Sequence, residues 1–143
     1  MPDILHDLVI RAPRPAVFAA LSTPAGLDAW WTLDAEGEAR EGAGWRLGFG
    51  PEFQWKAKVS RCVPDSDFEW VLTAADADWT GTQVGFRLRD RDGGTALRFE
   101  HRGWPAINDH YRTSACCWAM YLRLLRKFLE EGSVVPYEAR LDA

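Results

Sequence analysis

The longest amphipathic pattern in the chain lies between Gly103 and Gly132, and it restricts the fold more than any other feature. Asn108 or Asp109 is a candidate N-cap for a helix, and Gly132 is a candidate for the residue that ends it. Apolar side chains recur on one helical face at Tyr111, Ala115, Trp118, Leu122, Leu125 and Leu129. The pattern predicts one helix of about 24 residues, roughly 36 Å long, which needs a large apolar surface to pack against.

The residues before this helix alternate between apolar and polar positions, which is typical of strands with one buried face. After a first strand at Asp3–Arg11, two short helices are predicted at Pro13–Leu21 and from Pro24 to about Trp30. Six further strands are predicted at residues 35–39, 45–49, 53–60, 68–73, 80–89 and 97–102. Short turns between consecutive strands imply an antiparallel sheet with the long helix over its apolar face, so the predicted class is α+β.

Length and composition limit the kind of protein this can be. The 143 residues suit one domain, spanning residues 1–143, with a hydrophobic core. Eight tryptophans imply either a very aromatic core or a cavity lined by aromatic side chains. A net charge of −4 argues against a nucleic-acid partner, because proteins that bind nucleic acids favour a basic face.

Neither membrane insertion nor secretion is expected from the sequence. No apolar run is long enough to span a membrane, and the first ten residues lack the regions of a signal peptide. Two of the three cysteines, Cys116 and Cys117, are adjacent within the predicted helix and point about 100° apart. Reduced thiols and a cytoplasmic location are therefore expected.

Two stretches, one near each end of the chain, together resemble a known family. The first reads Ala12-Pro13-x-x-x-Val17-Phe18 and Leu21-Ser22-Thr23-Pro24-x-x-Leu27-x-x-Trp30-Trp31-Thr32. The second reads Gly103-Trp104 and Trp118-x-x-Tyr121-Leu122-x-x-Leu125-x-x-Phe128-Leu129-Glu130-x-Gly132. From Ile4 to Gly132 the chain resembles the family named for the activator of heat-shock-protein 90 ATPase, within the START/Bet v 1-like (SRPBCC, polyketide cyclase-like) superfamily.

This resemblance implies a helix-grip fold, in which a strongly curved antiparallel sheet of six to seven strands wraps around the C-terminal helix and leaves a cavity between them. Members of the superfamily bind lipids, hormones and polyketides, and some are catalysts, so the fold does not fix the function. Cys117 departs from the pattern, because many relatives carry glycine before the tryptophan. A larger residue at this position narrows the space between helix and sheet.

The inward face of the predicted sheet and the long helix supply the candidate ligand-binding residues. They are Trp30, Trp31, Phe49, Trp55, Trp70, Phe86, Phe99, His101, Trp104, Ser114, Trp118 and Tyr121. An apolar wall with a few polar groups is typical of a small-ligand site. Trp30, Trp31 and Trp104 are expected near the cavity mouth, and Phe53 and Phe68 are expected to point inward as well. The alternative is that these aromatic side chains simply fill the core.

His101 is the most informative polar candidate. It is in register with Leu97 and Phe99, so its side chain is expected to point inward. A neutral imidazole there can hydrogen-bond a ligand or act as an acid or base. The alternative is a core or rim histidine held by a carboxylate or a backbone group. His6 is also expected to point inward, and His110 is expected on the surface.

Neither a cofactor nor a metal ion is expected. The adjacent Cys116 and Cys117 cannot easily place both thiolates on one ion from a helix, and no Cys-x-x-Cys or His-x-x-x-His pattern occurs. The sequence contains no Gly-x-Ser-x-Gly nucleophile motif. Gly42-Ala43-Gly44 leads into a predicted strand, whereas phosphate-binding glycine loops lead into a helix.

Three functions remain open at this point. The favoured one is binding of a small hydrophobic or aromatic molecule between sheet and helix. The second is a cyclase- or hydrolase-type enzyme that uses His101, with Tyr121, as acid and base; Glu36, Glu38 and Glu52 are candidates for a second titratable group. The third is a chaperone-associated interaction protein, which the family name implies.

Self-association is also open. The predicted outer face of the sheet carries Lys56, Lys58, Arg87, Arg89, Arg98 and Arg102, too charged for an obligate apolar interface. With Glu100 among the arginines, a solvated ion-pair lattice is expected there. An exposed Trp45 or Trp79 would offer a patch for a homodimer.

Overall fold

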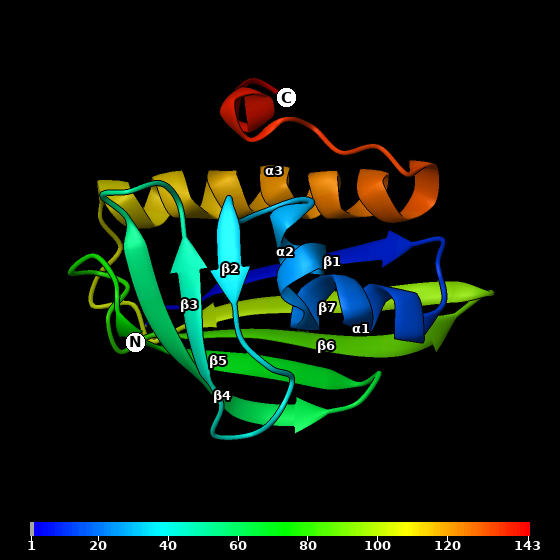
Figure 1. The fold of residues 1–143 in the computed structure, drawn as a ribbon, viewed down its shortest axis with the longest axis horizontal. Helices are drawn as coiled ribbons and strands as arrows, with labels where there is room; N and C mark the ends of the chain where they lie inside the picture. Colours follow the sequence, from blue (N-terminus) through cyan, green and yellow to red (C-terminus); the bar gives the residue numbers. More distant parts are fainter. Residues whose placement is uncertain (1) are drawn as a thin grey trace.

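A computed structural model describes residues 2–143, which form one curved seven-stranded antiparallel sheet with helices on one side (Figure 1). The strands are β1 (Ile4–Ile10), β2 (Asp34–Glu36), β3 (Gly44–Gly48), β4 (Gln54–Val63), β5 (Asp67–Ala74), β6 (Gln83–Arg91) and β7 (Gly94–Arg102). Their order in the sheet is β1-β7-β6-β5-β4-β3-β2. The predicted fold class and the predicted number of strands are therefore confirmed.

The tight hairpin between β6 and β7 sets the register of the central strands. Asp92 and Gly93 both have positive φ, 46° and 80°, as a two-residue turn with the twist of its flanking strands requires. This turn places Phe86 opposite Phe99. Register shifts between β4 and β5 mark bulges, at which a strand bends and its twist increases.

Two short helices follow β1, as predicted, and cover one end of the sheet (Figure 1). They are α1 (Arg14–Ser22) and α2 (Pro24–Asp28), and the Thr23 hydroxyl caps α2 by accepting the Gly26 N–H. Gly26 permits their close approach, because a Cβ there would lie 2.5 Å from the Ala19 carbonyl oxygen. The two helices therefore form a tight angle that brings the following residues over the sheet.

The long helix α3 (Asp109–Glu131) lies along the same side of the sheet (Figure 1). Its N-cap is Asn108, whose side-chain oxygen accepts the Tyr111 N–H, and Gly132 ends it with φ of 70°. Its buried face consists of Ser114, Trp118, Leu122, Leu124 and Leu125. Among the helices of residues 2–143, none combines the length and apolarity needed to cross a membrane.

Strand boundaries differ from the prediction where residues form turns and do not pair with a neighbouring strand. Phe53 was expected at the start of a strand with its side chain inward, but its N–H donates to Gly50 in a turn and the residue is 54% exposed. Thr80 was also expected in a strand, but its hydroxyl bonds the backbone of Ala75 and Asp76 in the loop before β6. The strand predicted at residues 35–39 is confined to Asp34–Glu36.

Trp45 and Trp79 are not exposed, so the homodimer patch expected from them is wrong. They are only 3% and 7% exposed. Trp45 packs on Phe68 and Trp70, with ring centroids 6.1 and 5.6 Å away. Alternation predicts which face of a strand a residue occupies, but whether another element covers that face depends on the tertiary fold.

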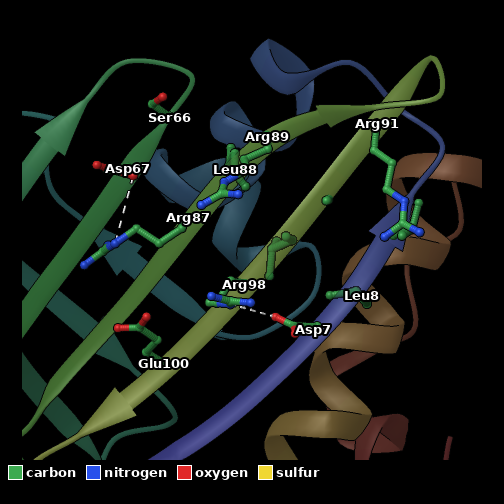
Figure 2. Close-up of a pocket in the computed structure, with 13 residues that line it drawn as sticks. Asp7, Leu8, Ser66, Asp67, Arg87, Leu88, Arg89, Arg91, Arg98 and Glu100 are labelled. Carbon is green, nitrogen blue, oxygen red and sulfur yellow. Dashed lines mark hydrogen bonds and ion pairs between the residues drawn. The ribbon is translucent and has the colours of Figure 1, made fainter.

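The outer face of the sheet carries the expected lattice of ion pairs (Figure 2). Asp7 on β1 lies 3.1 Å from Arg98 on β7, and Arg87 on β6 lies 2.9 Å from the buried carboxylate of Glu69. Arg102 lies 2.7 Å from the same carboxylate. Asp7, Arg87 and Arg98 line a hollow of about 810 Å³ on this face. Because acidic and basic side chains on different strands pair with one another, this face of the sheet stays polar.

The C-terminal segment crosses α3 on the side away from the sheet (Figure 1). Within its 3₁₀ helix η1 (Tyr137–Asp142), Arg140 is 3% exposed. The guanidinium donates to the carbonyl oxygens of Asp28 (2.7 Å), Thr32 (3.1 Å) and Val135 (3.0 Å). Arg140 therefore ties the end of the chain to the connection between α2 and β2.

Replacing Arg140 by alanine is expected to lower the free energy of unfolding by about 2 kcal/mol, because hydrogen bonds to a charged group are lost and buried carbonyls are left unpaired. Urea unfolding measures this change, and limited proteolysis is expected to cut residues 133–143 first. Arg123→Ala, at an exposed position on α3, is the matched control and is expected to change little. Equal stability of the two variants would contradict the role assigned to Arg140.

Candidate functional site

A small apolar pocket of about 210 Å³ lies between α3, the ends of β3 and β4, and the loop before β6. It is lined by Trp31, Phe49, Trp55, Trp79, His110, Thr113, Ser114, Cys117, Trp118 and Tyr121. Its volume is below the roughly 300–1,000 Å³ of most small-molecule sites. It exceeds the roughly 150 Å³ of an apolar cavity that admits benzene. The pocket therefore suits a compact ligand.

Five aromatic side chains form a closed circuit around this pocket, which we name the aromatic wall. Trp31 contacts Phe49 and Trp118, with ring centroids 5.3 and 4.9 Å apart. Trp55 contacts Phe49 at 4.8 Å and Trp79 at 4.9 Å. Trp79 and Trp118 complete the circuit at 5.7 Å. Each ring thus touches two others, which fixes their positions.

The aromatic wall is assembled from segments far apart in the sequence. Trp31 follows α2, and its backbone N–H donates to the Leu27 carbonyl. Phe49 follows β3, Trp55 lies near the start of β4, and Trp118 is in the middle of α3. Trp79 is held in its loop by the hydrogen bond that its backbone N–H donates to the Asp76 carbonyl. The pocket consequently exists only when the sheet, helix and loop are in place together.

His101 lies behind this wall and is fully buried. The Trp118 Nε1–H donates to His101 Nδ1 at 3.1 Å, so the ring proton is on Nε2, which lies 2.8 Å from the Thr82 hydroxyl. That hydroxyl donates to the Trp79 carbonyl at 2.6 Å. Burial, with a smaller effect of His110, lowers the pKa of His101 to about 3. Both nitrogens are occupied and the ring is neutral, which favours the core-histidine alternative.

Half of the predicted ligand-binding residues lie at the pocket and half do not. Trp31, Phe49, Trp55, Ser114, Trp118 and Tyr121 line it. Trp30, Trp70, Phe86, Phe99, His101 and Trp104 are fully buried elsewhere in the core. Trp30 and Trp104, expected at the mouth, are interior residues, and the Trp30 indole N–H donates to Ala20. The central space expected between sheet and helix is therefore occupied by aromatic side chains.

Four residues at the pocket were not among the predicted ligand-binding residues, namely Trp79, His110, Thr113 and Cys117. Of these, Cys117 was expected only to narrow the space between helix and sheet. Trp79 lies in a short polar loop directly after Asp78, and no alternation of apolar and polar residues marked it. His110, expected on the surface, is half-buried, with Nδ1 2.9 Å from Asp78 and Nε2 3.6 Å from Asp76. His6 does point inward, and its Nε2 donates to the Ala115 carbonyl.

The titratable groups of the pocket are uncharged or are engaged with other side chains. Burial raises the pKa of the Cys117 thiol, with a further effect of Cys116, and burial also raises the pKa of the Tyr121 phenol. Glu36 and Glu38 are exposed and paired with arginines away from the pocket. Among the described residues, the pocket lining contains no carboxylate, lysine or arginine. Within residues 2–143, no group of three metal-ligating side chains occurs.

The buried histidine gives a pH prediction. Because its folded pKa is below the unfolded value near 6.5, the unfolded chain binds an extra proton between pH 6.5 and about 3, so acid favours unfolding. At pH 5 this amounts to about 2 kcal/mol relative to pH 7.5. His101→Gln keeps a donor and an acceptor but does not titrate. From pH 7.5 to pH 5, we expect the free energy of unfolding measured in urea to fall by about 2 kcal/mol less in His101→Gln than in the wild type. Identical pH dependence would contradict the assignment.

The comparisons with known proteins agree with this fold. The sequence profile of the family described as "Activator of Hsp90 ATPase homolog 1-like protein" matches residues 11–130. No curated protein sequence matches the chain.

Solved structures resemble the chain over most of its length. The Aha1 dimer from Colwellia psychrerythraea is 30% identical, with a TM-score of 0.84 over 93% of this chain and 99% of that one. Protein MLL2253 from Mesorhizobium loti is 19% identical, with a TM-score of 0.80 over 93% and 100%. CalU16 from Micromonospora echinospora is 21% identical, with a TM-score of 0.72 over 91% and 77%. The chain therefore belongs to the activator of Hsp90 ATPase homolog 1-like family, within the START/Bet v 1-like (SRPBCC) superfamily.

Proposed function

We propose that this protein binds a small hydrophobic or aromatic molecule in the pocket enclosed by the aromatic wall. The observation that carries the proposal is the contrast between this pocket and the rest of the interior. Elsewhere between sheet and helix, large side chains such as Trp70, Phe86 and Phe99 are fully buried and fill the space. At the aromatic wall, about 210 Å³ is left between rings that a ligand can contact directly.

The lining also indicates the size and polarity of the ligand. Flat aromatic faces provide apolar contact, while the hydroxyls of Thr113, Ser114 and Tyr121 supply the few polar groups that orient a ligand. The volume favours a group of one or two rings over a long-chain lipid. Binding is therefore proposed for a compact molecule, with the physiological ligand to be identified by mass spectrometry of natively purified protein.

An enzyme of the cyclase or hydrolase type has weaker support. His101, the residue on which that alternative depended, is buried with both nitrogens engaged and with its pKa lowered to about 3. A general base must remain available to a substrate and must bind a proton near the working pH. Binding without turnover is accordingly the favoured activity.

The role of the pocket can be tested by filling it. Cys117→Phe places a ring in the pocket, whereas Cys116→Phe changes the adjacent, exposed position on α3. With 1-naphthol as the probe in isothermal titration calorimetry, we expect Cys117→Phe to weaken binding at least tenfold and Cys116→Phe to leave it unchanged.

Two controls keep this test decisive. Circular dichroism and thermal unfolding check that Cys117→Phe folds; if it does not, Thr113→Trp at the exposed edge of the pocket replaces it. Unaltered naphthol binding in a folded, filled variant would show that the molecule binds elsewhere. Failure of the wild type to bind naphthol or any co-purified apolar molecule would remove the proposal.

Self-association has separate support in the Colwellia psychrerythraea relative, which is described as a dimer and is 30% identical. We therefore propose a homodimer of this chain. Sedimentation velocity at micromolar concentration is expected to give twice the mass of the 16.2 kDa chain. A monomer at all concentrations would contradict it.

A further inference from the structure

The aromatic wall has an unusual composition for a purely apolar pocket. Four of its five rings are indoles, those of Trp31, Trp55, Trp79 and Trp118. An indole face carries negative electrostatic potential and attracts cations more strongly than phenol or phenyl rings do. Successive rings along Trp31, Phe49, Trp55 and Trp79 are inclined by 66°, 57° and 51°, as adjacent sides of a cage are. Trp118 closes the circuit at 18° to Trp79 and 39° to Trp31, so these rings form one flatter side. The shape therefore resembles a cage that is open at one side.

The positive edges of two of these indoles are engaged within the protein. The Trp79 indole N–H donates to the Ser114 hydroxyl at 3.4 Å, and the Trp118 indole N–H donates to His101 Nδ1 at 3.1 Å. Neither donor remains for an anionic ligand. With these N–H groups used internally, Trp79 and Trp118 offer the pocket mainly their π faces.

The charges at the His110 edge of the pocket also favour a positive ligand. Its lining contains no lysine or arginine. The one imidazole in the lining, that of His110, faces two carboxylates, Asp78 at 2.9 Å and Asp76 at 3.6 Å. The Asn108 amide also donates to Asp78, at 3.4 Å. Beside this edge of the pocket, the acidic groups outnumber the basic one, and the whole chain has a net charge of −4. At this edge an approaching cation is thus attracted and an anion is repelled. The Arg140 guanidinium, whose charge acts on Tyr121 of the lining, donates to the carbonyls of Val135, Thr32 and Asp28.

We infer that the pocket binds a quaternary alkylammonium group, such as the trimethylammonium head of a small amine. A primary ammonium carries three N–H donors, and a lining without carboxylates would leave some of them unpaired. A quaternary ammonium has no N–H, and its methyl groups suit apolar walls while its charge interacts with the indole faces. This inference rests on the proposed binding function and names the class of its ligand.

The test compares two molecules of nearly the same shape that differ in charge. Choline carries a trimethylammonium group, and 3,3-dimethylbutan-1-ol carries a neutral tert-butyl group in its place. In isothermal titration calorimetry we expect the wild type to bind choline at least tenfold more tightly than the neutral alcohol. Cys117→Phe is expected to abolish this binding, and Cys116→Phe is expected to preserve it.

A second variant tests the indole faces themselves. Trp55→Phe retains an aromatic ring in the wall but weakens its attraction for a cation. We expect the dissociation constant for choline to rise severalfold, while that for the neutral alcohol changes little. An equal loss for both molecules would indicate lost packing alone and would contradict the cation–π interaction.

The outcomes separate this inference from the proposed function. Preference for choline that is lost in Cys117→Phe supports the inference and locates binding in the proposed pocket. Equal or tighter binding of the neutral alcohol overturns the inference, while the proposed apolar site stands. If neither molecule binds but 1-naphthol does, the inference fails again and the site is selective for neutral aromatic compounds. If naphthol also fails to bind, and no apolar molecule co-purifies, both proposals fall.

Discussion

The packing of Trp118 against the sheet is the interaction on which the rest of the structure depends. This side chain projects from the middle of α3, contacts Phe99 with ring centroids 4.5 Å apart, and donates its N–H to His101 on the same strand. It also touches Trp31 and Trp79, two other members of the aromatic wall. One residue therefore joins helix to sheet and forms one side of the pocket. The hydrogen bond fixes the indole orientation, which dispersion between rings alone would leave less defined.

Dense aromatic packing explains why the pocket is small and lies to one side. The indole N–H groups of Trp70 and Trp104 find no acceptor among residues 2–143, although both rings are fully buried. An unpaired buried donor costs roughly 1–3 kcal/mol, so the burial of these large rings must outweigh that cost. A helix-grip fold can enclose a large cavity, but here the side chains occupy its centre. Between α3 and the sheet, the space beside Cys117 remains open to a small molecule.

The C-terminal segment adds a feature outside the matched part of the family, which ends at residue 130. Arg140 binds the carbonyls of Asp28 and Thr32, close to Trp31, and the Tyr137 hydroxyl donates to the Phe49 carbonyl at 3.3 Å. The segment thus supports two members of the aromatic wall from behind. Exposed ion pairs on the opposite face of the sheet add little stability individually, so the buried contacts of Arg140 matter more for the shape of the site.

Local sequence determined the elements of this protein. The apolar repeat and the caps Asn108 and Gly132 defined α3, the turn at Asp92-Gly93 defined the central hairpin, and motifs at both ends identified the family. These features depend on residues close together in the chain, whose spacing and backbone preferences are readable directly.

Tertiary structure alone decided which aromatic residues form the pocket and which fill the core. Alternation predicts the face of a strand but not the depth of cover above it, so Trp70 and Trp55 looked alike although one is buried and the other lines the pocket. Trp79 in a polar loop and Arg140 in the last turn gained their roles from partners dozens of residues away. Long-range contacts of this kind follow from the assembled fold, because local propensity carries no information about them.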